Sequence, residues 1–384
     1  MAIPLHIEKD EAFMHRALTL ARETVALASP NPQVGCVLVK DGEIIGEGAH
    51  LYANRDHAEI VALKQARERG IDVTGATAYV TLEPCSHHGR TGPCADALVA
   101  AHIARAVVAT EDPNPQVSGQ GIARLRAAGI EVTLGILQQP ARDLNDAFAH
   151  FIQHHRPFVT LKAALSVDGY LAPSPQNRTP NQPHWLTGPA ARAEVQRLRH
   201  ASDAILTGIG TVLADDPALT DRTNLSRRRP LLRVILDTQL RTPLTSQLVR
   251  TANNDLLILT ALTASAEKIE ALREAGAEVQ TIPEQNNQLS LPEVLKALAE
   301  RNILSLLLEA GSHLNGAFLH QNLADKAILF YSETELGSQS LPFAEGIASP
   351  YLFQQTLQRT TRTAFDTDAC ITGYLHDPWS ATSH

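Results

Sequence analysis

The spacing of apolar residues in the first 150 positions alternates between the period of a helix and that of a strand. Apolar side chains recur at helical spacing over residues 8–28, and a short apolar run over 34–39 then leads to Asp41-Gly42, a pair typical of hairpin turns. We therefore expect a helix followed by two hairpin strands, the second over 43–46. Further helices are predicted over 58–69, 94–101, 119–128 and 137–153, and further strands over 76–82, 105–109 and 130–134.

A second alternating series begins after His154-His-Arg-Pro157 interrupts the pattern. Its strands are predicted over 158–165, 203–207, 231–237, 256–260, 278–282, 304–309 and 326–330, mostly with helical segments between them. Such alternation is typical of an α/β sheet covered by helices. Because 384 residues exceed what one hydrophobic core normally serves, we predict two domains, residues 1–153 and 154–384.

Composition and charge exclude two classes of partner. The formal net charge is −8, and the 33 Lys and Arg residues are scattered apart from the run Arg227-Arg228-Arg229, which is typical of a solvated loop. A long polyanion needs a basic face, so no nucleic-acid partner is expected. No stretch reaches the roughly 18 apolar residues that span a bilayer, and the first residues do not resemble a signal peptide. We therefore predict a cytoplasmic protein without a membrane partner.

Three side chains of the first half form a candidate metal site. His57 is predicted to lie in the first turn of a helix, Cys85 follows a predicted strand, and Cys94 opens the next helix behind Pro93. One imidazole and two thiolates bind zinc and leave a fourth position for water, whose pKa falls to about 7. Glu59 can then carry a proton to a leaving amine. The pattern predicts a catalytic Zn²⁺ site and hydrolytic deamination, with Glu59 as the proton carrier.

Other interpretations of these residues stay open. Cysteines in a cytosolic protein are usually small buried hydrophobic residues, and Cys36 and Cys370, which lack such metal-binding partners, are predicted to be plain core or surface residues. His87 and His88 lie close to the first ligand cysteine and are alternative ligands, although thiolates compete well for zinc. The complete combination of His-x-Glu, strand and two Pro-Cys pairs favours a zinc deaminase.

The second half contains two glycine-containing segments that follow predicted strands. Residues 304–318 are predicted to form a strand, a turn and a helix whose N-terminus could hold a phosphate, although the spacing alone favours a simple strand-to-helix turn. Residues 207–220 form a polar loop at a strand end, where open α/β sheets bind ligands. The dinucleotide-binding motif G-x-G-x-x-G is absent from the first strand of this half, which argues against a Rossmann domain.

Several motifs resemble those of the bacterial riboflavin-biosynthesis deaminase-reductases. Eight residues separate the two thiols in TLEPCSHHGRTGPC (81–94), whereas cytidine and transfer-RNA deaminases carry P-C-x-x-C. Gly92 stands where this family commonly has Pro. Further matching stretches lie at 31–36, 57–59 and 111–115 in the first half and at 162–169, 185–189, 204–220, 234–237 and 308–314 in the second half.

This resemblance implies a cytidine-deaminase-like three-layer N-terminal domain and a dihydrofolate-reductase-like C-terminal domain that uses NADPH. The implied substrate is a small phosphorylated pyrimidine, 2,5-diamino-6-(5-phosphoribosylamino)pyrimidin-4-one. Deamination would give a uracil, and reduction would convert its ribosyl group into a ribityl chain. A homo-oligomer is implied as well. The alternative is a cytidine-type or transfer-RNA-type deaminase with a non-catalytic C-terminal domain.

The resemblance also implies site residues in the second half. The implied NADPH contacts are Ala164, Trp185, Thr211, Asp215, Thr238, Gly311, Ser312, His313, Leu314, Asn315, Gly316 and Ala317. The implied substrate contacts are Pro183, Arg199, Leu219, Arg222 and Glu309. The two arginines can clamp a ribose 5-phosphate, and the glutamate can accept hydrogen bonds from ribose hydroxyl groups. Whether Lys162 and Asp168 assist is left open.

Overall fold

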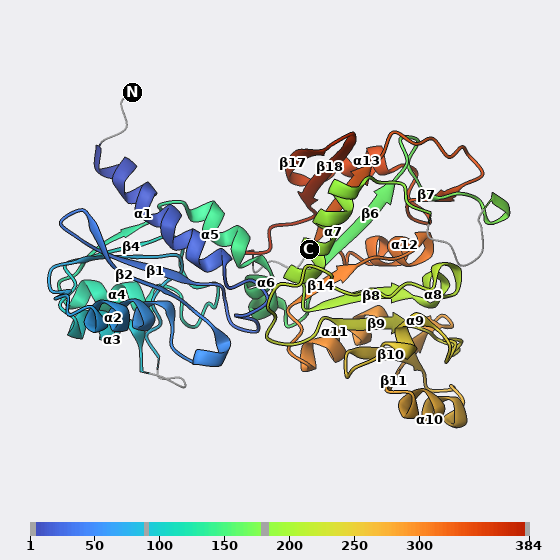
Figure 1. Cartoon of the computed structure of the whole chain (residues 1–384), viewed down its shortest axis with the longest axis horizontal. Helices are drawn as coiled ribbons and strands as arrows, with labels where there is room; N and C mark the ends of the chain where they lie inside the picture. The colour runs from blue at the N-terminus through green and yellow to red at the C-terminus, as the bar shows by residue number, and fades with distance from the viewer. Residues whose placement is uncertain (1–4, 88–91, 178–183, 381–384) are drawn as a thin grey trace. The chain divides into compact units, whose positions relative to one another are not determined.

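The chain forms two compact units, each with its own sheet (Figure 1). This computed structural model describes residues 5–87, 92–177 and 184–380. The first unit contains the chain up to His154, residues 226–228 and the chain from Trp379 onward. The second unit contains residues 155–225 and 229–378.

The first unit is a five-stranded sheet between two layers of helices. The strand order is β2 (Glu43–Ala49), β1 (Gly35–Lys40), β3 (Thr77–Val80), β4 (Arg105–Val108) and β5 (Glu131–Leu134). Strand β1 is antiparallel to both neighbours, and β3, β4 and β5 are parallel. One face packs on α1 (Leu5–Arg22) and α5 (Gln138–Leu144), and the other on α2 (Ala58–Glu68), α3 (Cys94–Ala100) and α4 (Gln120–Ala127). The three-layer prediction is confirmed.

Helix α2 packs against β2 with almost no side-chain atoms between the two backbones. The helix buries Ala58, Ala62 and Ala66, spaced four residues apart on one face. A Cβ atom at Gly46 would lie 2.5 Å from the Ala62 carbonyl oxygen, and one at Gly48 would lie 2.1 Å from that of Ala58. These two glycines therefore let the helix approach the strand, which fixes the position of its first turn.

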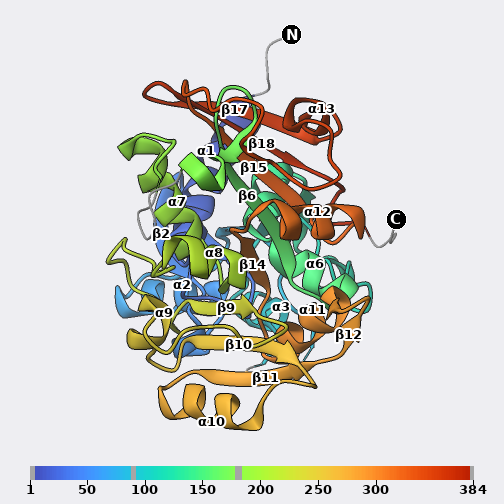
Figure 2. The same cartoon turned by 90° about the vertical axis from the view of Figure 1, so that its right-hand side faces the viewer.

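The second unit is built on a nine-stranded sheet in the part of the chain that the structure describes. Its order is β11 (Glu278–Ile282), β10 (Leu256–Ala261), β9 (Leu232–Leu236), β8 (Ala204–Gly208), β14 (Ser305–Leu308), β6 (Phe158–Leu165), β15 (Lys326–Tyr331), β18 (Asp368–Tyr374) and β17 (Gln358–Phe365). Figure 2 shows this order with β11 at the bottom and β17 at the top. The strands from β11 to β15 are parallel, and β18 and β17 pair antiparallel.

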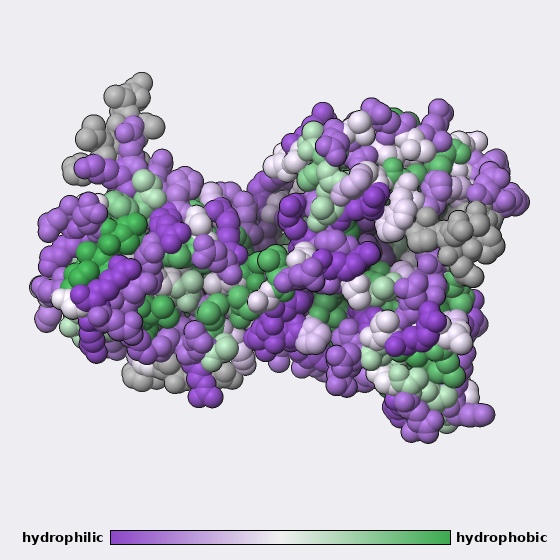
Figure 3. Space-filling view, viewed as in Figure 1, coloured by the Kyte–Doolittle hydropathy of each residue, from purple (hydrophilic) through white to green (hydrophobic). Residues whose placement is uncertain are grey.

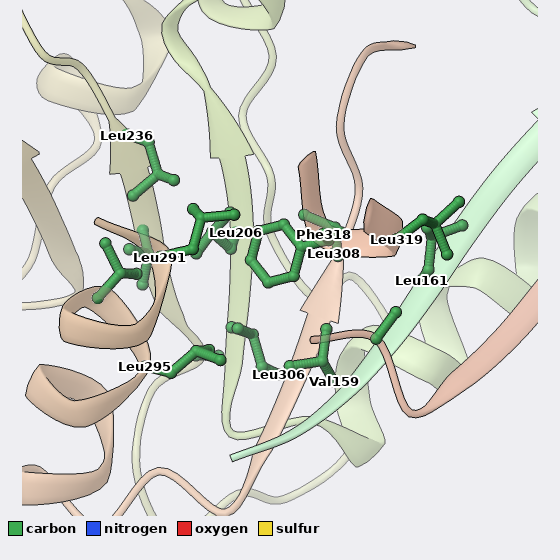
Figure 4. Close-up of a cluster of buried hydrophobic side chains, with 14 of the residues drawn as sticks. Val159, Leu161, Leu206, Leu236, Leu291, Leu295, Leu306, Leu308, Phe318 and Leu319 are labelled. Atoms are coloured by element: carbon green, nitrogen blue, oxygen red, sulfur yellow. The ribbon is translucent and has the colours of Figure 1, made fainter. Parts of the chain in front are cut away.

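Helices cover both faces of this sheet because alternate strand residues point to opposite sides. On one face, leucines of β6, β8, β9 and β14 meet α11 (Leu291–Glu300) and α12 (Ser312–His320), and Phe318 lies between Leu206 and Leu308 (Figure 4). The other face packs on α7 (Pro189–Ala201), α8 (Ile209–Asp215), α9 (Gln247–Arg250) and α10 (Ala266–Glu274). The predicted α/β class is therefore confirmed for this half too.

Two predicted helices in the first half have different limits. Helix α1 ends at Arg22 rather than near residue 28, because turns follow and Ala26 has a left-handed backbone with φ of 60°. The helix predicted over 137–153 is interrupted at Asn145, and its second part is α6 (Asp146–His154). The Asn145 side chain accepts from the Gln33 backbone N–H and donates to the Gln33 carbonyl. It therefore binds another segment at the point where the helix breaks.

Strands with little apolar pattern were missed or shortened by the prediction. Strand β2 continues to Ala49, and β17 was not predicted because seven of its eight residues are exposed, which leaves no buried face to read. The remaining short elements are η1 (Tyr52–Asn54), β7 (Tyr170–Ala172), η2 (Pro175–Asn177), β12 (Glu284–Gln285), β13 (Gln288–Leu289), β16 (Leu341–Pro342) and α13 (Pro350–Gln354).

The surface in Figure 3 is mostly hydrophilic, with hydrophobic residues in small groups. Among the described residues, no helix combines the length and the apolar character that crossing a bilayer requires.

Candidate functional site

Three segments of the first unit bring His57, Cys85 and Cys94 together. His57 is the residue before α2 and has extended backbone angles, so it lies just outside the helix rather than in its first turn as predicted. Its imidazole makes no capping hydrogen bond and is available to other groups. Cys85 lies in the loop after β3, and Cys94 is the first residue of α3, where Pro93 fixes the entry of the chain.

The distances between these side chains fit a tetrahedral metal site. The Nδ1 atom of His57 lies 3.5 Å from Cys85 Sγ and 3.2 Å from Cys94 Sγ. Ligands about 2.0–2.3 Å from a zinc ion are about 3.5 Å apart along a tetrahedral edge. The ligand atoms of these three side chains all lie within 4.8 Å of one another. The donor set fits Zn²⁺ with one position open to a small molecule.

The two thiols influence each other's protonation. Hydrogen bonds from the Cys94 thiol, His57 and the Cys94 backbone N–H lower the pKa of Cys85 to about 4, although burial opposes this change. The hydrogen bond between the two thiols and the burial of Cys94 raise the pKa of the Cys94 thiol. One thiolate is therefore stabilised by the protein alone, and a divalent cation is needed to stabilise the second beside it.

Glu59 is buried next to the three candidate ligands. Burial raises the pKa of its carboxyl group to about 7, while the nearby His57 opposes this shift. The Glu59 side chain also interacts with the Cys94 thiol. A carboxyl group with a pKa close to neutral pH can both take up and release a proton, which is the property that acid–base catalysis requires.

Two supporting interactions around this group were not singled out from the sequence. The buried Glu83 carboxylate accepts hydrogen bonds from the backbone N–H groups of Asp112, Gly119, Gly121 and Ile122 at 2.8–3.1 Å. Because Pro84 alone separates Glu83 from Cys85, these bonds tie the thiol loop to the start of α4. The only sequence signal for them is the acidic residue within TLEPC.

The imidazole of His50 forms the other supporting interaction. It is buried, lies edge-on to the His57 ring at 5.4 Å, and is held between Asn31 Nδ2 at 2.9 Å and the Asp56 carbonyl oxygen at 2.8 Å. Burial lowers the pKa of His50, which favours the neutral ring. Asn31 belongs to a motif quoted for the family resemblance, whereas His50 has no such signal.

The structure does not add the alternative ligand His87 to the candidate metal site. His87 is exposed and does not belong to the group of close ligands, and His88 lies outside the described residues. Cys36 is fully buried in the first unit, and burial raises the pKa of its thiol. Cys370 packs in the second unit with Phe330 and Ile328. Both cysteines are core residues, as expected.

The second unit contains a cavity of about 1200 Å³ at the carboxyl ends of β6, β8, β9 and β14. Of the implied NADPH contacts, those that line it are Ala164, Thr211, Asp215, Thr238, Gly311, Ser312, His313, Leu314 and Ala317. The structure also places in this lining a hairpin around β12 and β13 that the sequence did not predict.

The chemistry of this lining fits a phosphate-containing cofactor. Gly311 precedes α12 without a capping side chain, and a Cβ atom there or at Gly210 would meet no atom within 4 Å. The Ser312 hydroxyl is buried without a hydrogen-bond partner among the described residues. Free N–H groups at a helix N-terminus and an unused hydroxyl group together can hold a pyrophosphate.

Three implied NADPH contacts do not line the cavity. Trp185 is 61% exposed and lies beside Arg192, whose guanidinium is 5.2 Å from the ring. The Asn315 amide donates to the Phe343 carbonyl, and Gly316 faces the backbone of Glu345, where a Cβ atom would lie 2.3 Å from the carbonyl oxygen. In this structure, Asn315 and Gly316 have packing roles.

Two of the implied substrate residues contact each other. The Arg199 guanidinium donates to both Glu309 oxygens, at 2.7 and 3.1 Å, and Lys162 Nζ lies 3.6 Å from the same carboxylate. Burial alone would raise the pKa of Glu309, but the charges of Arg199 and Lys162 hold it at about 2. Glu309 and Lys162 line the cavity, whereas Arg199 also donates to the Thr220 carbonyl. Two cations thus share one carboxylate, so this trio keeps a net positive charge.

Arg222, Leu219 and Asp168 do not belong to the cavity lining. Arg222 is exposed, its backbone N–H bonds to Gln196, and Leu219 is buried in the core. Pro183 lies outside the described residues. Asp168 accepts hydrogen bonds from the backbone of Leu336 and Gly337, which is a structural role.

Comparison with protein-family profiles supports both halves. Residues 157–371 match the profile of the RibD C-terminal domain. Residues 7–110 match that of the cytidine and deoxycytidylate deaminase zinc-binding region.

Complete proteins resemble the whole chain. It is 41% identical to the riboflavin biosynthesis protein RibD of Escherichia coli over 365 residues, which cover 90% of this chain and 95% of that protein. The RibD protein of Actinobacillus pleuropneumoniae is 41% identical over 330 residues, or 86% and 85% of the two chains. Two solved structures are also similar, and in each case the match covers 96% of this chain and 99% of the solved chain. Acinetobacter baumannii RibD, form 1, is 37% identical with a TM-score of 0.80. A diaminohydroxyphosphoribosylaminopyrimidine deaminase/5-amino-6-(5-phosphoribosylamino)uracil reductase from Thermotoga maritima is 33% identical, also with a TM-score of 0.80.

Proposed function

Because the chain belongs to the RibD family of bifunctional riboflavin-biosynthesis enzymes, we propose that it deaminates 2,5-diamino-6-(5-phosphoribosylamino)pyrimidin-4-one and then reduces the product. The deaminase requires Zn²⁺ and the reductase requires NADPH. The final product is 5-amino-6-(5-phosphoribitylamino)uracil. The observation that carries the proposal is the convergence of one imidazole and two thiols beside a buried carboxyl group with a pKa of about 7.

In the first unit, His57, Cys85 and Cys94 would hold the ion. Zinc supplies Lewis acidity, which makes water nucleophilic at neutral pH. Glu59 accepts a proton from the attacking water and delivers it to the departing amino group, so ammonia leaves and a carbonyl group replaces the amine. The burial of Glu59 supports this role, because it brings the pKa of the carboxyl group near neutral pH.

In the second unit, NADPH supplies the hydride that reduces C1′ of the opened ribosyl group. Glu309 orients the ribose hydroxyl groups with the carboxylate that Arg199 fixes. Lys162 lies on the same carboxylate and lines the cavity, so it can hold the substrate near the reacting carbon. The phosphate clamp by Arg199 and Arg222 stays a prediction, and the contact between Arg199 and Glu309 favours a positioning role for Arg199.

The remaining parts of the proposal concern location and assembly. We assign the deaminase activity to residues 1–153 and the reductase activity to residues 154–384. The substrate is a small phosphorylated molecule. The cytoplasmic location and the homo-oligomer remain predictions.

The decisive experiment supplies the purified chain with the diaminopyrimidinone substrate and NADPH. We expect release of ammonia together with oxidation of NADPH, and the deaminated intermediate alone should also support NADPH oxidation. A deaminase with a non-catalytic C-terminal domain would release ammonia and leave NADPH unchanged. The cavity of the second unit and the family of the chain argue against that alternative.

A further inference from the structure

We propose that Arg241 binds the 2′-phosphate of NADPH and thereby distinguishes NADPH from NADH. This inference rests on the proposed reductase function, because it assigns a role within the same cavity. Arg241 belongs to the lining of that cavity and is exposed. It follows β9 and was not among the residues that the sequence indicated.

The cavity runs across the ends of four adjacent strands. Lys162 lies on β6, Glu309 follows β14, Gly208 ends β8, and Thr238 and Arg241 follow β9. Three strand spacings therefore separate β6 from β9, or about 14 Å. An extended dinucleotide cofactor can lie along this row of strand ends with its two halves over different strands.

The charged groups fix the direction of the cofactor along this row. Hydride transfer requires the nicotinamide beside the substrate, and the buried pair Lys162 and Glu309 lies at the β6 and β14 end. The start of α12 has no capping side chain, and the Ser312 hydroxyl has no hydrogen-bond partner among the described residues. These groups can bind the pyrophosphate, which lies between the nicotinamide and adenosine halves of the cofactor. The adenosine half is then directed toward β9, where Arg241 lies.

Lys162 and Arg241 are the Lys and Arg side chains of this lining, and Arg241 is the one without an acidic partner among the described residues. The other one, Lys162, lies 3.6 Å from the Glu309 carboxylate. Within the described ranges, Arg241 forms neither a hydrogen bond nor an ion pair. A phosphate monoester carries a charge of about −1.5 to −2, and a guanidinium group can bind it through two parallel hydrogen bonds. NADH lacks this phosphate, so the interaction is selective.

Polar neighbours extend the same subsite. Thr238 and Gln239 line the main cavity and also an adjoining one of about 470 Å³, together with Thr263 and Ser265. Their side chains can donate further hydrogen bonds to phosphate oxygens. His313 is the other basic side chain of the main lining, but its ring nitrogens contact Glu345 and Gln288 at 2.6 and 2.8 Å.

The backbone that carries Arg241 is anchored on both sides. The Asp237 carboxylate accepts hydrogen bonds from the Thr242 backbone N–H and hydroxyl group, both at 2.7 Å. Leu240 is fully buried and has a left-handed backbone with φ of 53°, which its place in the core maintains. The guanidinium group is therefore presented from a fixed loop, which lowers the entropy cost of binding a phosphate.

The test measures binding rather than turnover. The full-length chain, as wild type and as Arg241→Gln, is titrated calorimetrically with NADP⁺, NAD⁺, adenosine 2′,5′-bisphosphate and 5′-AMP. Arg241→Gln should bind the two 2′-phosphorylated ligands about tenfold to a hundredfold more weakly, as expected for the loss of charge-assisted hydrogen bonds. Its affinity for NAD⁺ and 5′-AMP should stay within about twofold. Arg241→Lys should retain part of the preference.

Arg250→Gln is the matched control, because it removes one exposed arginine of the same unit outside the cavity lining. It should bind all four ligands as the wild type does. An unchanged ratio of NADP⁺ to NAD⁺ affinity in Arg241→Gln, or an equal loss for both, would overturn the inference. If the wild type binds neither dinucleotide, the proposed reductase function itself fails. Thermal unfolding of Arg241→Gln checks that the variant is folded.

Discussion

At the scale of single residues, Glu59 combines burial with three neighbouring metal-binding side chains. An exposed carboxyl group would be ionised at neutral pH and could release no proton there. Burial brings its pKa to about 7, so that both protonation states are accessible. The residue therefore has the properties of a proton carrier rather than of a further ligand.

Replacing this carboxyl group by an amide should separate metal binding from catalysis. We expect Glu59→Gln to retain about one zinc ion per chain and to lose deaminase activity by about 10²–10⁴-fold, because the amide cannot transfer the proton. Metal analysis and ammonia release measure the two properties. Glu68→Gln, an exposed substitution in the same helix, is the control. Unchanged turnover in Glu59→Gln would remove the residue from the proposed mechanism.

The Glu309 carboxylate should make the stability of the second unit depend on pH. Its pKa is about 2 in the folded chain against an ordinary value of 4.5, so its ionised form stabilises the fold above about pH 4.5. This contribution, on the order of 3 kcal/mol, should disappear as the pH falls toward 2. The difference in unfolding free energy between wild type and Glu309→Gln should therefore narrow over this range.

Calorimetric unfolding measures this difference, and the transition of the second unit is identified by its shift on adding NADP⁺. A difference that stays constant from pH 6 to pH 3 would show that the ion pair with Arg199 does not stabilise the fold in this way.

Local motifs are what made some site residues predictable. His57 and Glu59 are two positions apart, and the ligand cysteines flank one loop, so the pattern of residue types and spacings is visible in the sequence. The contact between Arg199 and Glu309 joins residues 110 positions apart, so no local sequence pattern predicts it. Arg241 is a single arginine after a strand, and only its place in the cavity lining identifies it as a candidate cofactor-binding residue.

At the scale of elements, strands too could be predicted only where their own sequence has an apolar pattern. Strand β6 alternates buried and half-buried residues and was predicted with its observed limits, whereas the exposed β17 has no apolar period. The break at Asn145 depends on Gln33, which lies 112 residues away. Sequence patterns thus predicted most of the elements that bury a face, although they missed the partly buried β18, and they missed features that depend on distant partners.

The contact between α2 and β2 gives a prediction at this scale. Gly48→Ala should place a methyl group against the Ala58 carbonyl and push the start of α2 away from β2. Overpacking of this kind costs about 1–3 kcal/mol. Because His57 and Glu59 lie at this end of the helix, zinc retention and deaminase activity should both fall, while NADPH-dependent reduction of the deaminated intermediate persists.

Gly92→Ala is the control for this substitution, since an added Cβ atom there meets no atom of the described residues within 4 Å. It should retain both activities. Urea unfolding, metal analysis and the two assays are measured on the same preparations. Full zinc content and deaminase activity in Gly48→Ala would mean that the helix tolerates the displacement.

At the scale of the whole molecule, the two candidate sites use residues of different units. Removing zinc with a chelator should abolish deamination and lower the unfolding temperature of the first unit, because a ligand that binds the folded state stabilises it. Binding of NADP⁺ and the unfolding of the second unit should not change. Calorimetry with and without NADP⁺ distinguishes the two transitions, and loss of NADP⁺ binding on chelation would contradict the independence of the sites.

The return of the chain to the first unit has a consequence for how the protein is made. Trp379 packs with that unit: its ring N–H donates to the Arg142 carbonyl, and its own carbonyl accepts from Gln153. During synthesis on the ribosome, residues up to His154 emerge first, but the first unit is complete only after more than two hundred further residues have been added and Trp379 has emerged. A nonsense codon at position 379 would leave every described strand of the reductase sheet intact and yet impair the deaminase.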